Sequence, residues 1–229
     1  MTRDRRLTWD GCTNVRDLGG LQTVDGRVTR WGALVRSDHP ANLTSAGWSA
    51  LYDYGIRTII TLTTHGYPES KPDLAPRPAD LITLSCAIED FTDEEFVEKW
   101  VLNELVCSPL YYSEALRRWP ALYTAVIEAI ARARPGGVLF HCIRGVDRTG
   151  IIALLLLALV GVVPEDILTD YALTPDAKRD ELLAREHTTT RETILTTLAH
   201  LDAARYLLDS GLSEADLTAV RAHLLNTNA

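Results

Sequence analysis

The sequence of 229 residues predicts an α/β fold, in which helices flank a central, mostly parallel but mixed sheet and the C-terminal third is helical. Three observations support this prediction. Runs of strand length alternate with segments of helical periodicity between residues 31 and 160. Residues 56–62 are rich in apolar and β-branched side chains, as in a strand that is buried on both faces of a parallel sheet. After Pro164, only helical patterns follow.

The first half of the chain is expected to alternate strands and helices. In chain order, we expect an ordered loop or strand end at 14–20, a hairpin turn at 23–28, strands at 31–36, 56–62 and 81–87, and a helix from 44 to 54. Asp25-Gly26 between β-type residues is the turn signal. Thr44 is a common helix N-cap, and Gly55 is a common helix stop. The Pro- and Gly-rich residues 64–78 predict a long loop near the end of a strand.

The second half contains the longest apolar run. In chain order, we expect a helix that opens with a capping box at 92–95, a helix at 113–134 with a first turn or kink at Pro120, a strand at 138–140, a buried helix at 149–160, and helices after Pro164, Pro175 and Ser213. The helix at 149–160 is apolar on every side, which argues against a surface helix. We therefore expect it to be the central helix of the fold.

A polar segment joins the strand at 138–140 to this helix, and it reads His-Cys-Ile-Arg-Gly-Val-Asp-Arg-Thr-Gly from residue 141 to 150. A helix N-terminus has unpaired N–H groups and a partial positive charge, so a phosphate group fits there. The same field favours the thiolate form of Cys142, and the planar fork of Arg148 can hold two oxygens. Gly145 lets the loop bend, and the Thr149 hydroxyl is expected to donate to the sulfur. The expected phosphate-binding residues are Ile143, Arg144, Gly145, Val146, Asp147 and Arg148.

This segment resembles the phosphate loop of the cysteine-dependent tyrosine phosphatases, in particular the bacterial, atypical dual-specificity type with an Asp-Arg-Thr-Gly loop. Asn-Val-Arg-Asp-Leu-Gly-Gly at residues 14–20 is similar to the Asn-x-Arg-Asp-x-Gly-Gly signature of that family. Residues 34–37 and Asp170-Tyr171 also fit its pattern. The resemblance implies a cysteine-phosphatase-like fold and hydrolysis of phosphate monoesters through a phosphocysteine intermediate. A length of 229 residues suffices for one large α/β domain or for two small ones, and we expect a single domain over residues 1–229.

Two features depart from the family pattern. Many members have Lys where this chain has Val146, and they have Asp and Arg where it has Thr61 and Thr63. The first departure bears on the substrate, because polyanionic esters such as phosphoinositides favour a positive charge there. Arg144 either compensates for the missing charge, or it turns to solvent or to an acid. The second departure bears on the support around the site.

Dephosphorylation also requires a proton for the leaving oxygen. In the resembling family, an acid on a loop at the strand ends supplies it. Asp90 follows the strand at 81–87 and is the leading candidate, while Glu89, Asp93 and Asp147 are alternatives.

Two other polar groups are expected near the loop. His141 adjoins the cysteine and is expected to order the loop through a hydrogen bond to the main chain. Arg16 and Asp17 either pair with each other or with the main chain, or they line the pocket directly.

Composition narrows the class of protein. A net charge of −8 and a pI near 5.2 argue against a nucleic-acid partner. The apolar run at 151–163 is too short to span a membrane, and the charged first ten residues do not resemble a signal peptide. Four scattered cysteines predict neither a disulfide framework nor a zinc site. We therefore expect a cytoplasmic protein that uses no metal and no cofactor.

Several functions are compatible with a cysteine loop at a helix N-terminus. The leading hypothesis is a phosphatase that acts on phosphotyrosine in proteins, and the alternative is a phosphatase of metabolites or sugar phosphates. A phosphoinositide phosphatase, a rhodanese-like sulfurtransferase and an inactive phosphate-binding module fit less well. The sulfur-transfer reaction does not call for the Asp-Arg-Thr-Gly continuation, and an inactive module could dispense with the cysteine.

Overall fold

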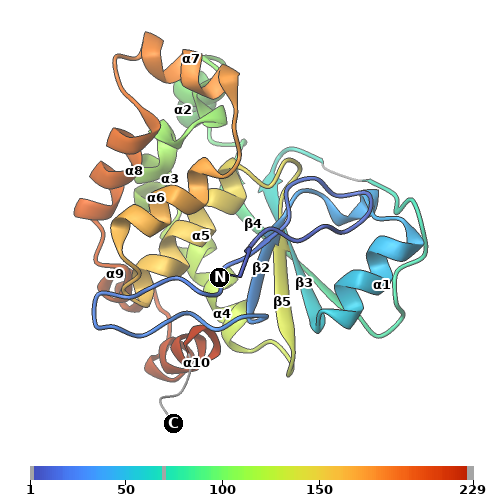
Figure 1. Cartoon of the computed structure of the whole chain (residues 1–229). Helices are drawn as coiled ribbons and strands as arrows, with labels where there is room; N and C mark the ends of the chain where they lie inside the picture. The colour runs from blue at the N-terminus through green and yellow to red at the C-terminus, as the bar shows by residue number, and fades with distance from the viewer. Residues whose placement is uncertain (1–2, 69–70, 226–229) are drawn as a thin grey trace.

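The computed structural model describes residues 3–68 and 71–225, which form a five-stranded mixed sheet covered by helices (Figure 1). The strands are β1 (Arg16–Asp17), β2 (Leu34–Ser37), β3 (Ile56–His65), β4 (Ile82–Asp90) and β5 (Gly137–His141), in the order β1-β2-β5-β3-β4. β1 is antiparallel to β2, and every other pairing is parallel. The predicted α/β class with a mostly parallel, mixed sheet is confirmed.

Helices cover both faces of the sheet. The helices are α1 (Ser45–Asp53), α2 (Glu94–Phe96), α3 (Tyr112–Arg118), α4 (Pro120–Ala131), α5 (Asp147–Leu159), α6 (Pro164–Ala172), α7 (Ala177–Arg185), α8 (Thr190–Ala199), α9 (Ala203–Asp209) and α10 (Glu214–Leu224). Short turns of other helix types are η1 (Pro40–Asn42), η2 (Val97–Val101), η3 (Leu105–Cys107) and η4 (Pro109–Tyr111). In Figure 1, α1 covers one face of the sheet and the other labelled helices gather on the opposite side. None of the helices within residues 3–68 and 71–225 has the length and apolar character needed to cross a bilayer.

Side chains of the central strands point alternately to the two faces of the sheet, and they contribute to a hydrophobic core on each face. In β3, Ile59 packs with Trp48 of α1, whereas Ile60 packs in the larger core around α5. Successive side chains of a strand point to opposite faces, so each of these parallel strands must be apolar on both. Within α5, every residue from 149 to 157 is buried. This burial confirms the prediction of a central helix, and it fixes the position of the helix N-terminus.

The boundaries of several predicted elements change in the structure. The helix expected at 113–134 breaks at Trp119, and Pro120 becomes the first residue of α4, where its missing N–H has no consequence. The predicted capping box starts one residue later, because the Asp93 carboxylate, rather than the Thr92 hydroxyl, accepts a hydrogen bond from the amide of Phe96. The strand expected at 81–87 continues to Asp90.

Candidate active site

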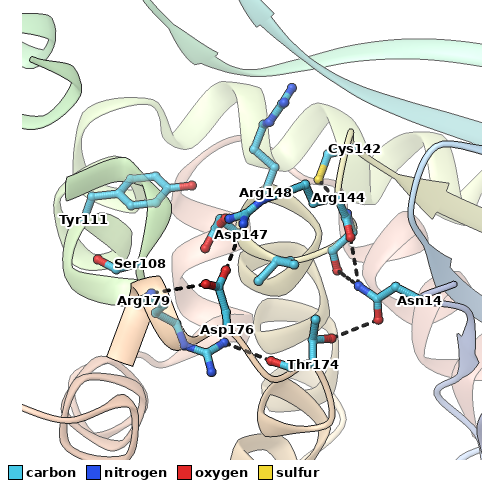
Figure 2. A network of polar contacts seen from close by, with 12 residues as sticks. Asn14, Ser108, Tyr111, Cys142, Arg144, Asp147, Arg148, Thr174, Asp176 and Arg179 are labelled. Carbon is cyan, nitrogen blue, oxygen red and sulfur yellow. Dashed lines mark hydrogen bonds and ion pairs between the residues drawn. The ribbon is translucent and has the colours of Figure 1, made fainter. Parts of the chain in front are cut away.

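Cys142 lies in the turn between the central strand β5 and the N-terminus of α5, at the edge of the sheet where the parallel strands end. Ligands of open α/β sheets bind at this edge. The cysteine is 5% exposed, and its Sγ accepts a hydrogen bond from the amide of Gly145 at 3.3 Å (Figure 2). The sulfur therefore faces the inside of the loop, at the start of a helix whose dipole favours an anion.

Gly145 shapes the loop because no other residue fits there. Its φ of +69° lies in the left-handed region, which L-residues with a side chain rarely adopt. A Cβ atom at this position would lie 2.4 Å from the carbonyl oxygen of Ser37 in β2. The loop thus presses its main chain against the end of the neighbouring strand, which holds the Gly145 amide toward the sulfur.

Two side chains bind the outside of the loop through its carbonyl groups. Asn14 Nδ2 donates to the carbonyl oxygens of Arg144 at 2.8 Å and of Gly145 at 3.2 Å. Arg36 Nη2 donates to the carbonyl oxygens of Gly145 at 2.9 Å and of Val146 at 3.3 Å. The C=O and N–H groups of a trans peptide point in opposite directions. Holding the carbonyls outward therefore leaves the amides free to face the interior of the loop.

A buried carboxylate in α6 fixes these supports. Asp170 accepts hydrogen bonds from Arg5 at 2.7 Å, from Arg16 at 3.2 Å and from Arg36 at 2.7 Å, and the last two side chains are also buried. Burial alone raises the pKa of Asp170, but the three guanidinium groups outweigh it and lower the pKa to about 2. One carboxylate thus pairs with three guanidinium groups behind the loop. Together these four side chains have a net positive charge.

Arg16 and Asp17 hold the scaffold and do not pair with each other. Arg16 Nη1 donates to the side-chain oxygen of Asn14 at 2.5 Å, which orients the amide that binds the loop. Asp17 accepts hydrogen bonds from the amide of Gly32 at 2.7 Å and from the Tyr54 hydroxyl at 2.5 Å. Both residues are buried, so the structure favours the supporting role for this motif.

Arg148 lines the same pocket as Cys142, but its fork is not aimed at the sulfur. Its Nη1 donates to the carbonyl oxygen of Leu62 in β3 at 2.9 Å, and its Nε lies 3.9 Å from the carboxylate of Glu89. In Figure 2, the guanidinium group extends away from the sulfur. The expected arrangement, in which the fork of Arg148 closes over the sulfur, is not seen in this structure. Leu62 and Glu89, which contact the guanidinium group, lie on two other strands, so the sequence could not show these contacts.

Two of the four candidate acids, Glu89 and Asp147, line the pocket. Glu89 accepts hydrogen bonds from the hydroxyls of Tyr111 at 2.7 Å and Thr64 at 3.0 Å, and burial raises its pKa. Burial also raises the pKa of Asp147, although Arg144 at 3.0 Å opposes the effect. A carboxyl group with a raised pKa keeps its proton to higher pH, as a general acid must.

The other two acids lie elsewhere. Asp90, the leading candidate from the sequence, accepts hydrogen bonds from the hydroxyl of Thr92 at 2.6 Å and from its amide at 2.9 Å, which lower the pKa of the carboxyl. Asp93 caps α2 and pairs with Arg118, which lowers its pKa too. Neither is among the residues that line the pocket. Both carboxylates are held in the ionised form, and neither suits the donation of a proton.

Two predictions about the residues flanking the loop have different outcomes. His141 Nδ1 lies 3.0 Å from the carbonyl oxygen of Cys142 and Nε2 lies 2.9 Å from the Thr61 hydroxyl, so the ring orders the loop as expected. Burial lowers the pKa of His141 to about 3 and keeps the ring neutral. The hydrogen bond expected from Thr149 to the sulfur is not formed, because the hydroxyl is fully buried at the start of α5 and has no hydrogen-bond partner.

The site opens into a pocket of about 220 Å³. Its floor includes the loop, and its walls are largely apolar or aromatic, contributed by Tyr67, Phe91, Val106, Tyr111 and Ile143. The rings of Tyr67 and Phe91 meet edge to face at 6.1 Å between centroids. A larger open hollow of about 620 Å³ lies along residues 6–16, but it does not include the cysteine loop. Because Cys142 lines the smaller pocket, we take that pocket as the candidate active site.

The supporting residues were not recognised from the sequence as loop contacts. Asn14, Arg36 and Asp170 are separated by more than twenty residues, so no local pattern joins them. One signal was present: Arg36 follows the apolar Leu34 and Val35 at the end of a predicted strand, and a charge that becomes buried there must be paired. The position of its partner could come only from the fold.

The chain is similar to several proteins that are named as phosphatases. The chain is 31% identical over 169 residues to a protein of Cupriavidus necator provisionally named a tyrosine-protein phosphatase, with 72% of this chain and 61% of that protein aligned. It is 34% identical over 152 residues to the tyrosine-protein phosphatase of Nostoc commune, covering 62% of this chain and 48% of that protein. It is 25% identical to the triple specificity protein phosphatase PtpB of Mycobacterium tuberculosis, covering 94% of this chain and 97% of that protein.

The alignments with the first two relatives thus span about half to three fifths of the length of those proteins. The match to a family extends further along the chain. The description "Tyrosine phosphatase family" applies to residues 7–226, which include the loop, its supports and all the helices named above. The chain belongs to the tyrosine phosphatase family.

Proposed function

We propose that the protein hydrolyses phosphate monoesters through a phosphocysteine intermediate, with phosphotyrosine and related aryl phosphates as its substrates. One observation carries the proposal. The Cys142 sulfur accepts a hydrogen bond from the Gly145 amide at the N-terminus of a buried helix, and it lines one pocket together with Asp147 and Arg148. This arrangement combines a nucleophile, an anion site and an acid. We also propose that residues 1–229 contribute a single phosphatase domain.

In the first step, the Cys142 thiolate attacks phosphorus and the bond to the leaving oxygen breaks. The main-chain amides of residues 143–148 and the helix dipole hold the phosphoryl oxygens as their charge redistributes. An oxyanion in the pocket also offers Arg148 a stronger partner than the neutral carbonyl of Leu62, because charge-assisted hydrogen bonds are about twice as strong as neutral ones. We expect the guanidinium group to turn toward the phosphoryl group when a substrate binds.

Asp147 is our candidate for the proton donor in this step. It lies in the first turn of α5, it lines the pocket, and burial raises its pKa. Its proton passes to the leaving oxygen. In the second step, the Asp147 carboxylate takes a proton from the water that attacks the phosphocysteine, and inorganic phosphate and the free thiolate result.

Glu89 is assigned a positioning role. It is held by Tyr111 and Thr64, and it faces the guanidinium group of Arg148 across 3.9 Å. Its side chain is 4% exposed, against 13% for Asp147, so Glu89 is the less accessible of the two acids to a substrate. Its carboxyl group instead faces the Arg148 guanidinium group and helps to keep it beside the pocket.

The walls of the pocket support an aryl substrate. Tyr67, Phe91 and Tyr111 surround the space above the loop, and aromatic side chains pack favourably against another ring. The relatives from Nostoc commune and Mycobacterium tuberculosis are named a tyrosine-protein phosphatase and a triple specificity protein phosphatase, and both names are consistent with this choice.

Turnover by matched variants tests the proposal. We expect release of phosphate from 4-nitrophenyl phosphate and from a phosphotyrosine peptide, with much slower release from glucose 6-phosphate. Cys142→Ser should abolish turnover, whereas Cys107→Ser, which removes the other thiol that lines the pocket, should retain it. Near-normal turnover by Cys142→Ser, or no turnover of either aryl ester by the unmodified protein, would contradict the proposed function.

A further inference from the structure

Arg144 is the exposed cation of the loop, and two acids already neutralise it. Its Nη1 lies 2.8 Å from Asp176 and its Nη2 lies 3.0 Å from Asp147. The arginine is 48% exposed, whereas the two carboxylates are only 12% and 13% exposed. The arginine therefore lies across two fixed acids at the mouth of the pocket (Figure 2).

Asp176 is held in place independently of Arg144. It is the N-cap of α7, where its Oδ1 accepts a hydrogen bond from the amide of Arg179 at 3.2 Å. The side chain of Arg179 is buried and donates to the carbonyl oxygen of Thr174 at 3.2 Å, which fixes the turn before the helix. The carboxylate thus stays beside the loop and keeps Arg144 turned away from a ligand.

The charge at the mouth of the pocket follows from these contacts. When Asp147 is ionised, it forms with Arg144 and Asp176 a trio of net negative charge. When Asp147 carries the proton for the leaving group, the trio is neutral. Arg148, the other cation that lines the pocket within the described residues, faces Glu89 and the carbonyl of Leu62. The mouth therefore offers no surplus positive charge to a second anion on the substrate.

We propose that Asp176 is a specificity-determining residue that makes the site discriminate against phosphate esters carrying a second anion beside the phosphoryl group. The inference rests on the proposed hydrolase activity. Val146 contributes to the same outcome, because it is buried and uncharged at the centre of the loop. The preferred substrate is then an aryl monophosphate in neutral surroundings.

Two phosphotyrosine peptides of equal length provide the test, one with alanine and one with glutamate on both sides of the phosphotyrosine. The readout is the ratio of kcat/KM for the acidic peptide to kcat/KM for the neutral peptide. Asp176→Asn keeps the helix cap, because asparagine caps as well as aspartate, but it removes the charge. We expect the ratio to rise about three- to fivefold, the size of a partly exposed ion pair. Asp180→Asn is the matched control, since Asp180 lies on the same helix but pairs with Arg179.

Arg144→Gln in the Asp176→Asn background should return the ratio to its original value, because the released guanidinium group carries the effect. In the unmodified protein, raising the salt concentration should weaken the discrimination, since exposed charges are screened. An unchanged ratio in Asp176→Asn, an equal shift in Asp180→Asn, or discrimination that is insensitive to salt would overturn the inference while both peptides are still hydrolysed. If the unmodified protein hydrolyses neither peptide, the proposed function fails and the inference fails with it.

Discussion

Gly145→Ala tests how strictly the loop geometry controls the chemistry. The native φ of +69° costs an L-residue about 1–2 kcal/mol of stability. The added methyl group would also lie 2.4 Å from the Ser37 carbonyl oxygen, and such contacts below 3.0 Å essentially never occur, so the two segments must separate by at least about 0.6 Å. A displacement of this order at a reacting group lowers the rate by up to about 10²-fold.

Gly211→Ala provides the control for backbone strain. Gly211 also has a positive φ, of +99°, but a methyl group there would meet nothing within 4 Å, and the residue lies between α9 and α10, outside the pocket lining. Gly211→Ala should lose about 1–2 kcal/mol of unfolding free energy, which for a chain of this size lowers Tm by roughly 2–8 °C. Gly145→Ala should lose at least as much, because its methyl group also meets the Ser37 carbonyl oxygen.

Only Gly145→Ala should lose kcat/KM for 4-nitrophenyl phosphate, by about 10²-fold. Thermal unfolding and steady-state kinetics on the two variants measure both effects. Full activity in Gly145→Ala, or an equal loss of activity in Gly211→Ala, would refute the argument that the contact with β2 sets the loop.

Three further predictions concern the acid, the loop support and stability. Asp147→Asn should lower kcat for an aryl phosphate by about 10²–10⁴-fold and remove the fall in rate as pH rises through the raised pKa of this acid, while Asp90→Asn should cost far less; similar losses in both variants would reopen the choice of proton donor. Arg36→Lys keeps the charge but not the fork that binds both Asp170 and the loop, so inhibition by inorganic phosphate should weaken about tenfold, and undiminished inhibition would exclude a role for this fork in shaping the anion site. The folded state keeps His141 neutral down to a pKa of about 3, whereas the unfolded chain takes up the proton near pH 6.5; the stabilisation is present above pH 6.5 and is lost as pH falls toward 3, by up to about 5 kcal/mol. Urea unfolding at several pH values should show this loss in the native protein and a flatter profile in His141→Gln, and identical profiles would contradict it.

The sheet and the central helix were predictable because apolar periodicity reports burial directly. The two-sided apolar character of the strand at 56–62 and the all-round apolar surface of 149–160 each admit few other placements. The loop at 142–148 was found because all its parts are adjacent in the sequence: a strand before, a glycine within and a helix start after. Local chemistry of this kind needs no knowledge of the fold.

The choice among the acids was not predictable, for a physical reason. The apolar pattern of β4 fades at its polar end, so the sequence could not show that the strand continues to Asp90. Successive side chains of a strand point to opposite faces, and a continued strand therefore sends Glu89 and Asp90 to opposite sides. Glu89 faces the pocket and Asp90 does not, a distinction that depends on a strand end only three residues longer than expected.

The contacts behind the loop were out of reach for a different reason. Arg36 and Asp170 are 134 residues apart, and although both fit the family pattern, nothing in the sequence shows that they pair with each other. Arg148 donates a hydrogen bond to the main-chain carbonyl of Leu62, and any residue type at that position would offer the same carbonyl, so the sequence does not indicate this contact. Interactions of this kind are decided by the order of strands in the sheet.

The central claim is that the Cys142 sulfur becomes bonded to phosphorus during turnover. Mixing the protein with excess 4-nitrophenyl phosphate, quenching in acid within milliseconds and analysing its peptides by mass spectrometry tests this claim directly. We predict a burst of nitrophenol close to one equivalent per protein when the second step is limiting, and a phosphoryl group on the peptide that contains Cys142. Turnover at a normal rate with the phosphoryl group on another residue would contradict the account. Turnover at a normal rate with no labelled peptide, and with no burst even in variants of Asp147, would contradict it as well.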